Sequence, residues 1–179
     1  MQRFSSSGFL AAVLVLLLVA VAGDAAADHP SGISGTQIAA SAGLRIDGSV
    51  RNPQIITVED IRDLPATRVN VAYQTKQGEA TASFTGVLLW TLLDRAGGID
   101  EAESRAEIRH TLKITGRDGY AVALSVGEID PKLAAEPAII AYLRDDQALD
   151  SGEALRLVMP WDRHATRNVR DVVRIEVKE

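Results

Sequence analysis

The segment that decides the fold lies near the end of the chain and reads Leu155-Arg156-Leu157-Val158-Met159-Pro160-Trp161. Its apolar residues favour an extended strand over residues 155–159. Pro160 ends this strand, because proline has no backbone N–H to donate to a sheet. A second run, residues 169–177, carries most of its apolar side chains at alternating positions, so we expect the chain to close with another strand.

The loop between these two strands is strongly basic. Residues 160–170 hold His164 and three arginines, which are Arg163, Arg167 and Arg170. Clustered arginines bind phosphate through charge-assisted, partly bidentate hydrogen bonds. The alternative is a charged surface loop whose arginines pair with neighbouring acidic residues. The sequence leaves both interpretations open.

Residues 44–143 have the pattern of short strands separated by turns and a few brief helices. Strands are expected at residues 44–50, 55–56, 69–83 around a turn at Gln77-Gly78, 110–115, 120–124 and 138–143. Short helices are expected after the N-cap residue Thr57, over residues 87–96, and after the capping-box spacing of Ser125 and Glu128. This order of elements predicts an α+β fold with mixed β-sheets and short helices, and it disfavours a doubly wound sheet.

Composition narrows the range of functions. The chain has 179 residues and a formal net charge of -5, and its hydrophobic and charged fractions are typical of a globular domain. An acidic chain is not expected to bind nucleic acid or an anionic membrane through broad electrostatic attraction. The sequence contains no cysteine, which excludes disulfides, thiolate nucleophiles, zinc–thiolate sites and cysteine-bound iron–sulfur clusters.

Residues 1–27 have the pattern of a signal peptide. Arg3 precedes an apolar and small run over residues 9–23, which is shorter than the roughly 20 residues that a spanning helix needs. Ala25-Ala26-Ala27 supplies the small residues that signal peptidase accepts, so cleavage is expected near Ala27. An earlier cleavage site and an uncleaved anchor are the alternatives. We therefore expect a periplasmic or secreted protein without a permanent membrane anchor.

The rest of the chain divides at about residue 43. Residues 28–42 are rich in Ser, Gly and Ala with little periodicity, and we interpret them as a flexible arm. Residues 43–179 are expected to form the folded domain, which is long enough to bury a core without disulfides.

Familiar catalytic and metal-binding motifs are not found in the sequence. The three histidines, His29, His110 and His164, provide no pair with metal-ligand spacing. No serine occupies a Gly-x-Ser-x-Gly turn, and no glycine-rich loop has phosphate-loop spacing. The sequence therefore assigns neither a catalytic residue nor a metal ligand.

Four segments taken together resemble the oxidoreductase molybdopterin-binding domain, a family with the sulfite-oxidase-type fold. They are Leu44-x-Ile46-x-Gly48-x-Val50-x-Asn52-Pro53, Phe84-Thr85-Gly86-Val87-Leu88-Leu89-x-x-Leu92-Leu93, Gly116-x-Asp118-Gly119-Tyr120, and the segment 155–161. The resemblance extends from Leu44 to the C-terminus and implies a sulfite-oxidase-like molybdopterin-binding fold. The last segment is similar to one in the catalytic subunits of periplasmic methionine sulfoxide reductases, in which Arg-x-x-x-Pro-Trp precedes basic residues near the pterin phosphate. That likeness implies that Arg156, Arg167 and Arg170 face a molybdopterin cofactor.

The chain departs from this family at the metal ligand. In the family, a single Cys after the strand that precedes the Phe-containing segment supplies the thiolate that binds molybdenum. The corresponding stretch here, residues 71–76, reads Val-Ala-Tyr-Gln-Thr-Lys, and the chain has no Cys elsewhere. A thiolate suits the redox chemistry of the metal, whereas a Gln amide or Thr hydroxyl is a harder donor. Tyr73 could supply a phenolate, although an aromatic residue in a strand more often packs into the core.

Three functional hypotheses follow. In the first, the chain is an exported protein of this family without conventional molybdenum catalysis, and its basic pocket binds a pterin or another small anion. The alternatives are an active molybdopterin oxidoreductase with a metal ligand other than Cys, and a periplasmic module that binds a protein partner. Molybdopterin is the cofactor that the resemblance implies.

Overall fold

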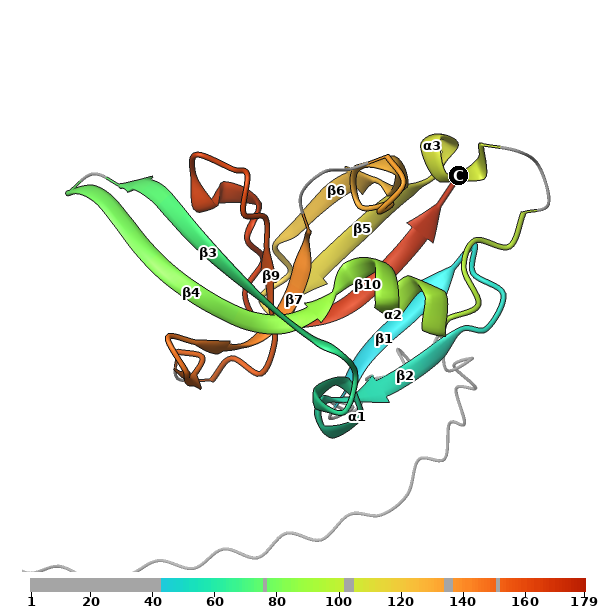
Figure 1. Cartoon of the computed structure of the whole chain (residues 1–179). Helices are drawn as coiled ribbons and strands as arrows, with labels where there is room; N and C mark the ends of the chain where they lie inside the picture. Colours follow the sequence, from blue (N-terminus) through green and yellow to red (C-terminus); the bar gives the residue numbers. More distant parts are fainter. Residues whose placement is uncertain (1–42, 76, 102–104, 134–136, 151) are drawn as a thin grey trace, which may run out of the picture. The chain divides into compact units, whose positions relative to one another are not determined.

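Two β-sheets, a few short helices and the connecting loops make up the computed structural model (Figure 1). The structure describes residues 43–179 except for 76, 102–104, 134–136 and 151. The expected signal peptide, residues 1–27, and the expected arm, residues 28–42, lie outside the described residues. Each helix in the described part is too short or too polar to cross a lipid bilayer.

The first sheet places the C-terminal strand at its centre. Its strands are β1 (Gly43–Gly48), β2 (Gln54–Thr57), β5 (Thr111–Gly116), β6 (Ala121–Ser125) and β10 (Val172–Lys178). Their order is β2-β1-β10-β5-β6. β1 and β10 pair in parallel, with Ile46 opposite Ile175, whereas the other neighbouring strands pair antiparallel. The two ends of the described domain therefore meet in one sheet.

The second sheet is built on a long hairpin. Its strands are β3 (Ala66–Thr75), β4 (Gly78–Leu88), β7 (Ile139–Arg144), β8 (Gln147–Ala148) and β9 (Arg156–Val158). Their order is β3-β4-β7-β8, and β9 also pairs with β7. Figure 1 shows the β3–β4 hairpin as a long curved ribbon that extends away from the first sheet. This hairpin forms one wall of the site described below. The other wall is formed by β9 and the loop that follows it, together with the end of β7.

Short helices connect the two sheets. α1 (Val58–Arg62) and the 3-10 turn η1 (Val126–Glu128) each begin at a capping box, the first between Thr57 and Asp60 and the second between Ser125 and Glu128. The other helical segments are α2 (Leu89–Arg95), α3 (Ala106–Arg109) and the 3-10 turn η2 (Ala165–Arg167). The chain leaves α2 through two glycines with φ values of 80° and 70°, a left-handed backbone that other residues rarely adopt.

Strand β7 of the second sheet is buried on both faces. The larger hydrophobic cluster joins the first sheet, α1 and α2 to one face of β7, where Ile140 is fully buried. A smaller cluster covers the opposite face, where Ile139 is fully buried. Its buried members are Val69, Val71, Phe84, Ile139, Ala141, Leu149 and Val158. Successive residues of a strand point to opposite faces, and β7 therefore contributes to both clusters.

The structure confirms the α+β class and corrects several boundaries. The expected helix over residues 87–96 begins at Leu89, because Val87 and Leu88 still pair with β7 at the end of β4. Gly86 allows this pairing, since a Cβ there would lie only 2.2 Å from the backbone oxygen of Ile140. The last strand begins at Val172, and the expected strand residue Val169 lies before it. The parallel pairing of β1 with β10 is not predicted by the local pattern.

A buried carboxylate joins the two parallel strands. Asp47 of β1 is 6% exposed and accepts hydrogen bonds from Arg45 and from Arg174 of β10. Burial by itself would raise the pKa of Asp47, but the hydrogen bonds from Arg174 and Arg45 outweigh burial and lower the pKa below its usual value. A carboxyl group with a lowered pKa stabilises the folded state above its unfolded pKa. That contribution is lost as the pH falls through the lowered value.

We expect Asp47→Asn to lower the free energy of unfolding by about 2 kcal/mol at neutral pH, because both arginines lose a charged acceptor. The difference between wild type and variant should shrink as the pH falls below about 4. Urea unfolding at a series of pH values measures both quantities. Asp94→Asn, at an exposed position on α2, is the matched control and should change stability by less than about 0.5 kcal/mol. A loss that stayed constant down to acidic pH would contradict this role of Asp47.

Candidate functional site

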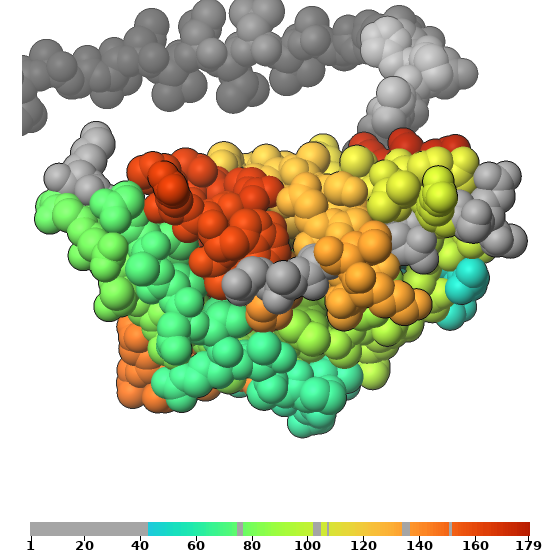
Figure 2. Space-filling view, turned by 45° about the horizontal axis from the view of Figure 1, so that its top comes forward, coloured from blue at the N-terminus to red at the C-terminus, as the bar shows by residue number. Residues whose placement is uncertain are grey.

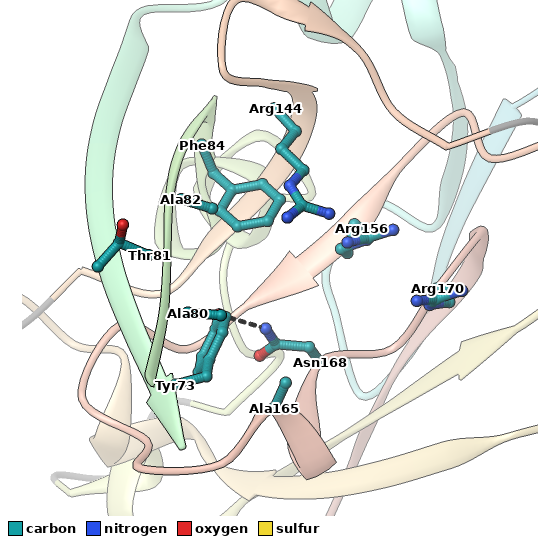
Figure 3. Close-up of a pocket in the computed structure, with 10 residues that line it drawn as sticks. All are labelled: Tyr73, Ala80, Thr81, Ala82, Phe84, Arg144, Arg156, Ala165, Asn168 and Arg170. Atoms are coloured by element: carbon teal, nitrogen blue, oxygen red, sulfur yellow. Dashed lines mark hydrogen bonds between the residues drawn. The ribbon is translucent and has the colours of Figure 1, made fainter. Parts of the chain in front are cut away.

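A pocket of about 290 Å³ lies on the face of the second sheet that carries the smaller hydrophobic cluster (Figure 3). Strand register explains its lining, because Tyr73 pairs with Ala80 and Phe84 pairs with Arg144. Paired residues on neighbouring strands point their side chains to the same face. The residues that line the pocket are Tyr73, Ala80, Thr81, Ala82, Phe84, Arg144, Arg156, Ala165, Asn168 and Arg170. This described lining contains three arginines and no carboxylate.

Arg156 is the most deeply buried charged residue of the pocket, with an exposed fraction of 6%. Its Nε and Nη2 donate to the two carboxylate oxygens of Glu153 at 2.7 and 2.6 Å, and Nη2 also donates to Asp150 at 2.8 Å. Its guanidinium carbon lies 5.7 Å from the centre of the Phe84 ring. Burial would lower the pKa of Arg156, but the hydrogen bonds to Glu153 and Asp150 raise it above its usual value. Arg156 therefore stays charged inside the domain.

The third nitrogen of this guanidinium, Nη1, differs from the other two in its hydrogen bonding. Among the described residues, Nη1 donates no hydrogen bond, since the three bonds of Arg156 engage only Nε and Nη2. Nη1 is also accessible to solvent. Among the described side chains, only Glu101 Oε2 is both buried and without a hydrogen-bond partner, so an unbonded Nη1 is not buried. Arg156 lines the pocket, so an acceptor bound there would reach a charged donor that is already fixed in place.

Two further arginines line the same pocket with little engagement by the protein. Nε of Arg144 lies 3.4 Å from Asp145, and Nε of Arg170 lies 3.5 Å from Glu153, so each ion pair is longer than an ordinary hydrogen bond. The Arg144 and Arg170 side chains are 40% and 67% exposed. Figure 3 shows the three arginines along one side of the pocket, away from the tyrosine. All three arginines line this one pocket, and their positive charge favours a negatively charged ligand there.

Tyr73 and Asn168 lie on the other side of the pocket (Figure 3). The backbone N–H of Met159 donates to Oδ1 of Asn168 at 3.1 Å, which fixes the orientation of the amide. Nδ2 of Asn168 then donates to the hydroxyl oxygen of Tyr73. Burial raises the pKa of Tyr73 above its usual value, so the phenol keeps its proton at neutral pH. Tyr73 is thus a neutral phenol in this pocket, with an O–H that no described residue receives.

The loop that carries Asn168 is anchored at both sides. The backbone N–H of Gln74, near the end of β3, donates to the Arg163 oxygen at 2.9 Å, and Nδ1 of His164 lies 3.1 Å from the Gln74 oxygen. On the other side, Arg167 donates to Asp162 and to Glu128 of η1. Figure 2 shows this C-terminal segment, in red, between the green β3–β4 hairpin and the orange segment around η1. The loop therefore closes one wall of the pocket against two other parts of the fold.

The structure separates the three arginines that the sequence singled out. Arg156 and Arg170 line the pocket, whereas Arg167 is paired with acidic neighbours and is not among the described lining residues. Pairing with acidic neighbours, one of the two interpretations of the basic loop, is therefore observed for Arg167. Anion binding by Arg170 stays a prediction. Sequence reasoning misses Arg144, because it ends an apolar strand just before two aspartates that indicate a turn. Its place in the pocket follows from its pairing opposite Phe84, which is not visible along the chain.

The donor atoms of this pocket do not fit the metal that the resemblance implies. The pocket offers guanidinium groups, a phenol and an amide, and the whole sequence contains no Cys. Guanidinium groups repel a metal cation, and the oxygen donors are harder than the thiolate that suits molybdenum. Elsewhere in the part of the chain that the structure describes, no three His, Cys, Asp or Glu side chains gather as a metal site would require. The arginines do fit the anionic portion of a pterin cofactor.

Comparison with known proteins identifies the fold. The family model for the oxidoreductase molybdopterin binding domain matches residues 34–179. The crystal structure of the sulfane dehydrogenase SoxCD from Paracoccus pantotrophus is similar, with a TM-score of 0.62 and 21% sequence identity. The match covers 77% of this chain and 38% of that chain, so the protein spans well under half of the chain it resembles. None of the curated proteins matches the sequence. The expected sulfite-oxidase-like molybdopterin-binding fold is thereby confirmed.

We expect Arg156→Met to destabilise the domain by about 3 kcal/mol, because the Glu153 carboxylate, which is 7% exposed, keeps only its longer ion pair with Arg170. The double variant Arg156→Met with Glu153→Gln should recover part of this loss, since the buried charge is removed with its partner. Arg170→Gln, at a largely exposed side chain, should cost less than about 1 kcal/mol. Urea unfolding of the wild type, the single variants Arg156→Met and Glu153→Gln, and the double variant measures the coupling. Additive effects of the two changes would show that Glu153 does not hold Arg156.

Proposed function

Because the chain belongs to the oxidoreductase molybdopterin-binding domain family, we propose that it is a binding member of that family whose pocket holds a small anion. A pterin phosphate is one such anion. The proposal excludes conventional molybdenum catalysis, in which a thiolate holds the metal. It includes export, for which the support is the signal-peptide pattern of residues 1–27.

One observation carries the proposal. Arg156 is buried, charged and fixed by Glu153, it lines the pocket, and its Nη1 donates no hydrogen bond to a described residue. A charged donor that the protein holds in place and leaves accessible is available to an acceptor that is not part of the chain. Arg144 and Arg170 add two further cationic groups at the same space. Arrangements of this kind recognise carboxylates and phosphates.

The size of the pocket limits the ligand. Small-molecule pockets in proteins have volumes of roughly 300–1,000 Å³, and the volume here, about 290 Å³, lies at the lower end. A small anion, or the anionic end of a larger pterin, fits this space. Since the chain matches 38% of the SoxCD chain at 21% identity, the dehydrogenase activity of that protein is not part of the proposal.

We expect inorganic phosphate or a pterin phosphate to raise the thermal unfolding midpoint of the protein, by an amount equivalent to about 2.7 kcal/mol at a hundredfold excess over the dissociation constant. Arg170→Gln should weaken binding about tenfold or more, because it removes a charge-assisted hydrogen bond. Arg51→Gln is the matched control, since Arg51 is exposed and donates to the Gly97 oxygen outside the pocket. Isothermal titration calorimetry measures the dissociation constants. Equal effects of the two variants, or no binding of either anion, would refute the anion site.

We expect the full chain, expressed in a cell that makes molybdenum cofactor and purified after export, to contain far less than one molybdenum atom per molecule. The reason is the donor set, in which no sulfur and only hard oxygen ligands are available near the arginines. Elemental analysis measures the metal, and fluorescence after oxidation measures a pterin in the same sample. Stoichiometric molybdenum would establish the alternative hypothesis of an oxidoreductase with a metal ligand other than Cys.

A further inference from the structure

The two sides of the pocket differ in the kind of atom that they recognise. Arg144, Arg156 and Arg170 present charged N–H groups, which bind an anionic oxygen. Tyr73 lies on the opposite side in Figure 3, together with Ala80 and Ala165. A single inorganic anion held by the arginines would leave this second side without a polar partner.

Tyr73 has one hydrogen that no described residue receives. Its hydroxyl oxygen already accepts the N–H of Asn168, and the amide cannot turn around because its Oδ1 receives the N–H of Met159. Since a phenol oxygen that accepts from an amide can still donate its own hydrogen, the O–H of Tyr73 is available to an acceptor bound in the pocket. The direction of the Tyr73 O–H is therefore set by the Asn168 amide and the Met159 N–H, both of which belong to the protein.

The surface between the two polar sides is apolar. Ala80, Ala82 and the ring of Phe84 lie along β4, and β-strand alternation places them on one face of the sheet with Tyr73. Phe84 is 2% exposed, so its ring position is fixed by the packing of the core. A short flat apolar body would bury its surface here, while a ligand that is polar throughout would leave this wall unmatched.

We propose that the pocket binds a small organic anion with two unlike ends: a carboxylate or other oxyanion held by Arg144, Arg156 and Arg170, and, beyond a short apolar body, a neutral hydrogen-bond acceptor that receives the hydroxyl of Tyr73. This inference rests on the anion site proposed above and specifies its ligand class. Tyr73 then determines specificity, since it distinguishes ligands by an atom that the arginines do not contact.

Three probes of one shape test this inference. The first, 4-acetylbenzoate, has the carboxylate, the flat body and the acceptor, while benzoate lacks the acceptor and 4-acetylbenzamide lacks the charge. We expect 4-acetylbenzoate to bind the full chain about fivefold more tightly than benzoate, the usual effect of one net hydrogen bond. The uncharged amide should bind more weakly than either anion. Isothermal titration calorimetry gives the three dissociation constants.

The variants separate recognition by Tyr73 from a structural effect. Tyr73→Phe should remove the preference for 4-acetylbenzoate over benzoate and leave the affinity for benzoate unchanged. Arg170→Gln should weaken both anions to the same extent and keep the preference. A structural role of Tyr73 would instead weaken the two anions equally, and that result would overturn the inference. The thermal midpoint of unliganded Tyr73→Phe, which should match the wild type within a few degrees, verifies that the variant folds.

The two proposals fail in different ways. If inorganic phosphate binds in an Arg170-dependent manner but neither benzoate does, or both benzoates bind equally, the two-ended ligand is wrong and the anion site stands. If phosphate, pterin phosphate and the benzoates all fail to bind, the anion site and the two-ended ligand are both wrong. If the protein binds 4-acetylbenzoate more tightly than benzoate and Tyr73→Phe abolishes this preference, the anion site and the two-ended ligand are both supported.

Discussion

Glu153 holds the guanidinium of Arg156 inside the domain, and the candidate site is arranged around that contact. A buried arginine is unstable without a charged partner, and the bidentate pairing with Glu153 supplies one at 2.6 and 2.7 Å. Because two of the three guanidinium nitrogens are engaged in this way, the third has a fixed direction. The same side chain lies over the ring of Phe84, so the charge of the pocket and the packing of the second sheet are coupled.

This chain has the fold of its family but contains no cysteine. The fold needs apolar strands in the right register, and the sequence retains them from β1 to β10. A thiolate suits the redox chemistry of molybdenum, and a chain without cysteine cannot supply one. What remains at the pocket is a set of arginines beside a protonated tyrosine. That set recognises oxygen atoms by charge and hydrogen bonding, so it supports binding without requiring a metal.

The C-terminal loop connects parts of the fold that carry the two sides of the pocket. It is tied to β3 through Gln74 and to η1 through Arg167, and it positions Asn168 against Tyr73. Arg167 therefore contributes to the site by holding the loop, while Arg170 on the same loop contacts the pocket directly. A loop fixed at several points keeps donors in place before a ligand arrives, which reduces the entropic cost of binding.

The amino-acid sequence determined the fold class, the N-cap at Thr57, the capping box at Ser125, the hairpin turns and the absence of a thiolate, because each follows from local periodicity, side-chain chemistry or composition. It also indicated Arg156 and Arg170 through resemblance. The inclusion of Arg144, the engagement of Arg167 by Asp162 and Glu128, and the hydrogen bond from Asn168 to Tyr73 were settled by the tertiary structure. Strand register and the β1–β10 pairing bring those segments together. Neither can be predicted from residues that are adjacent in the sequence. Which of several arginines lines the pocket depends on three-dimensional packing, since all of them carry the same charge and their positions along the chain do not show where each side chain points.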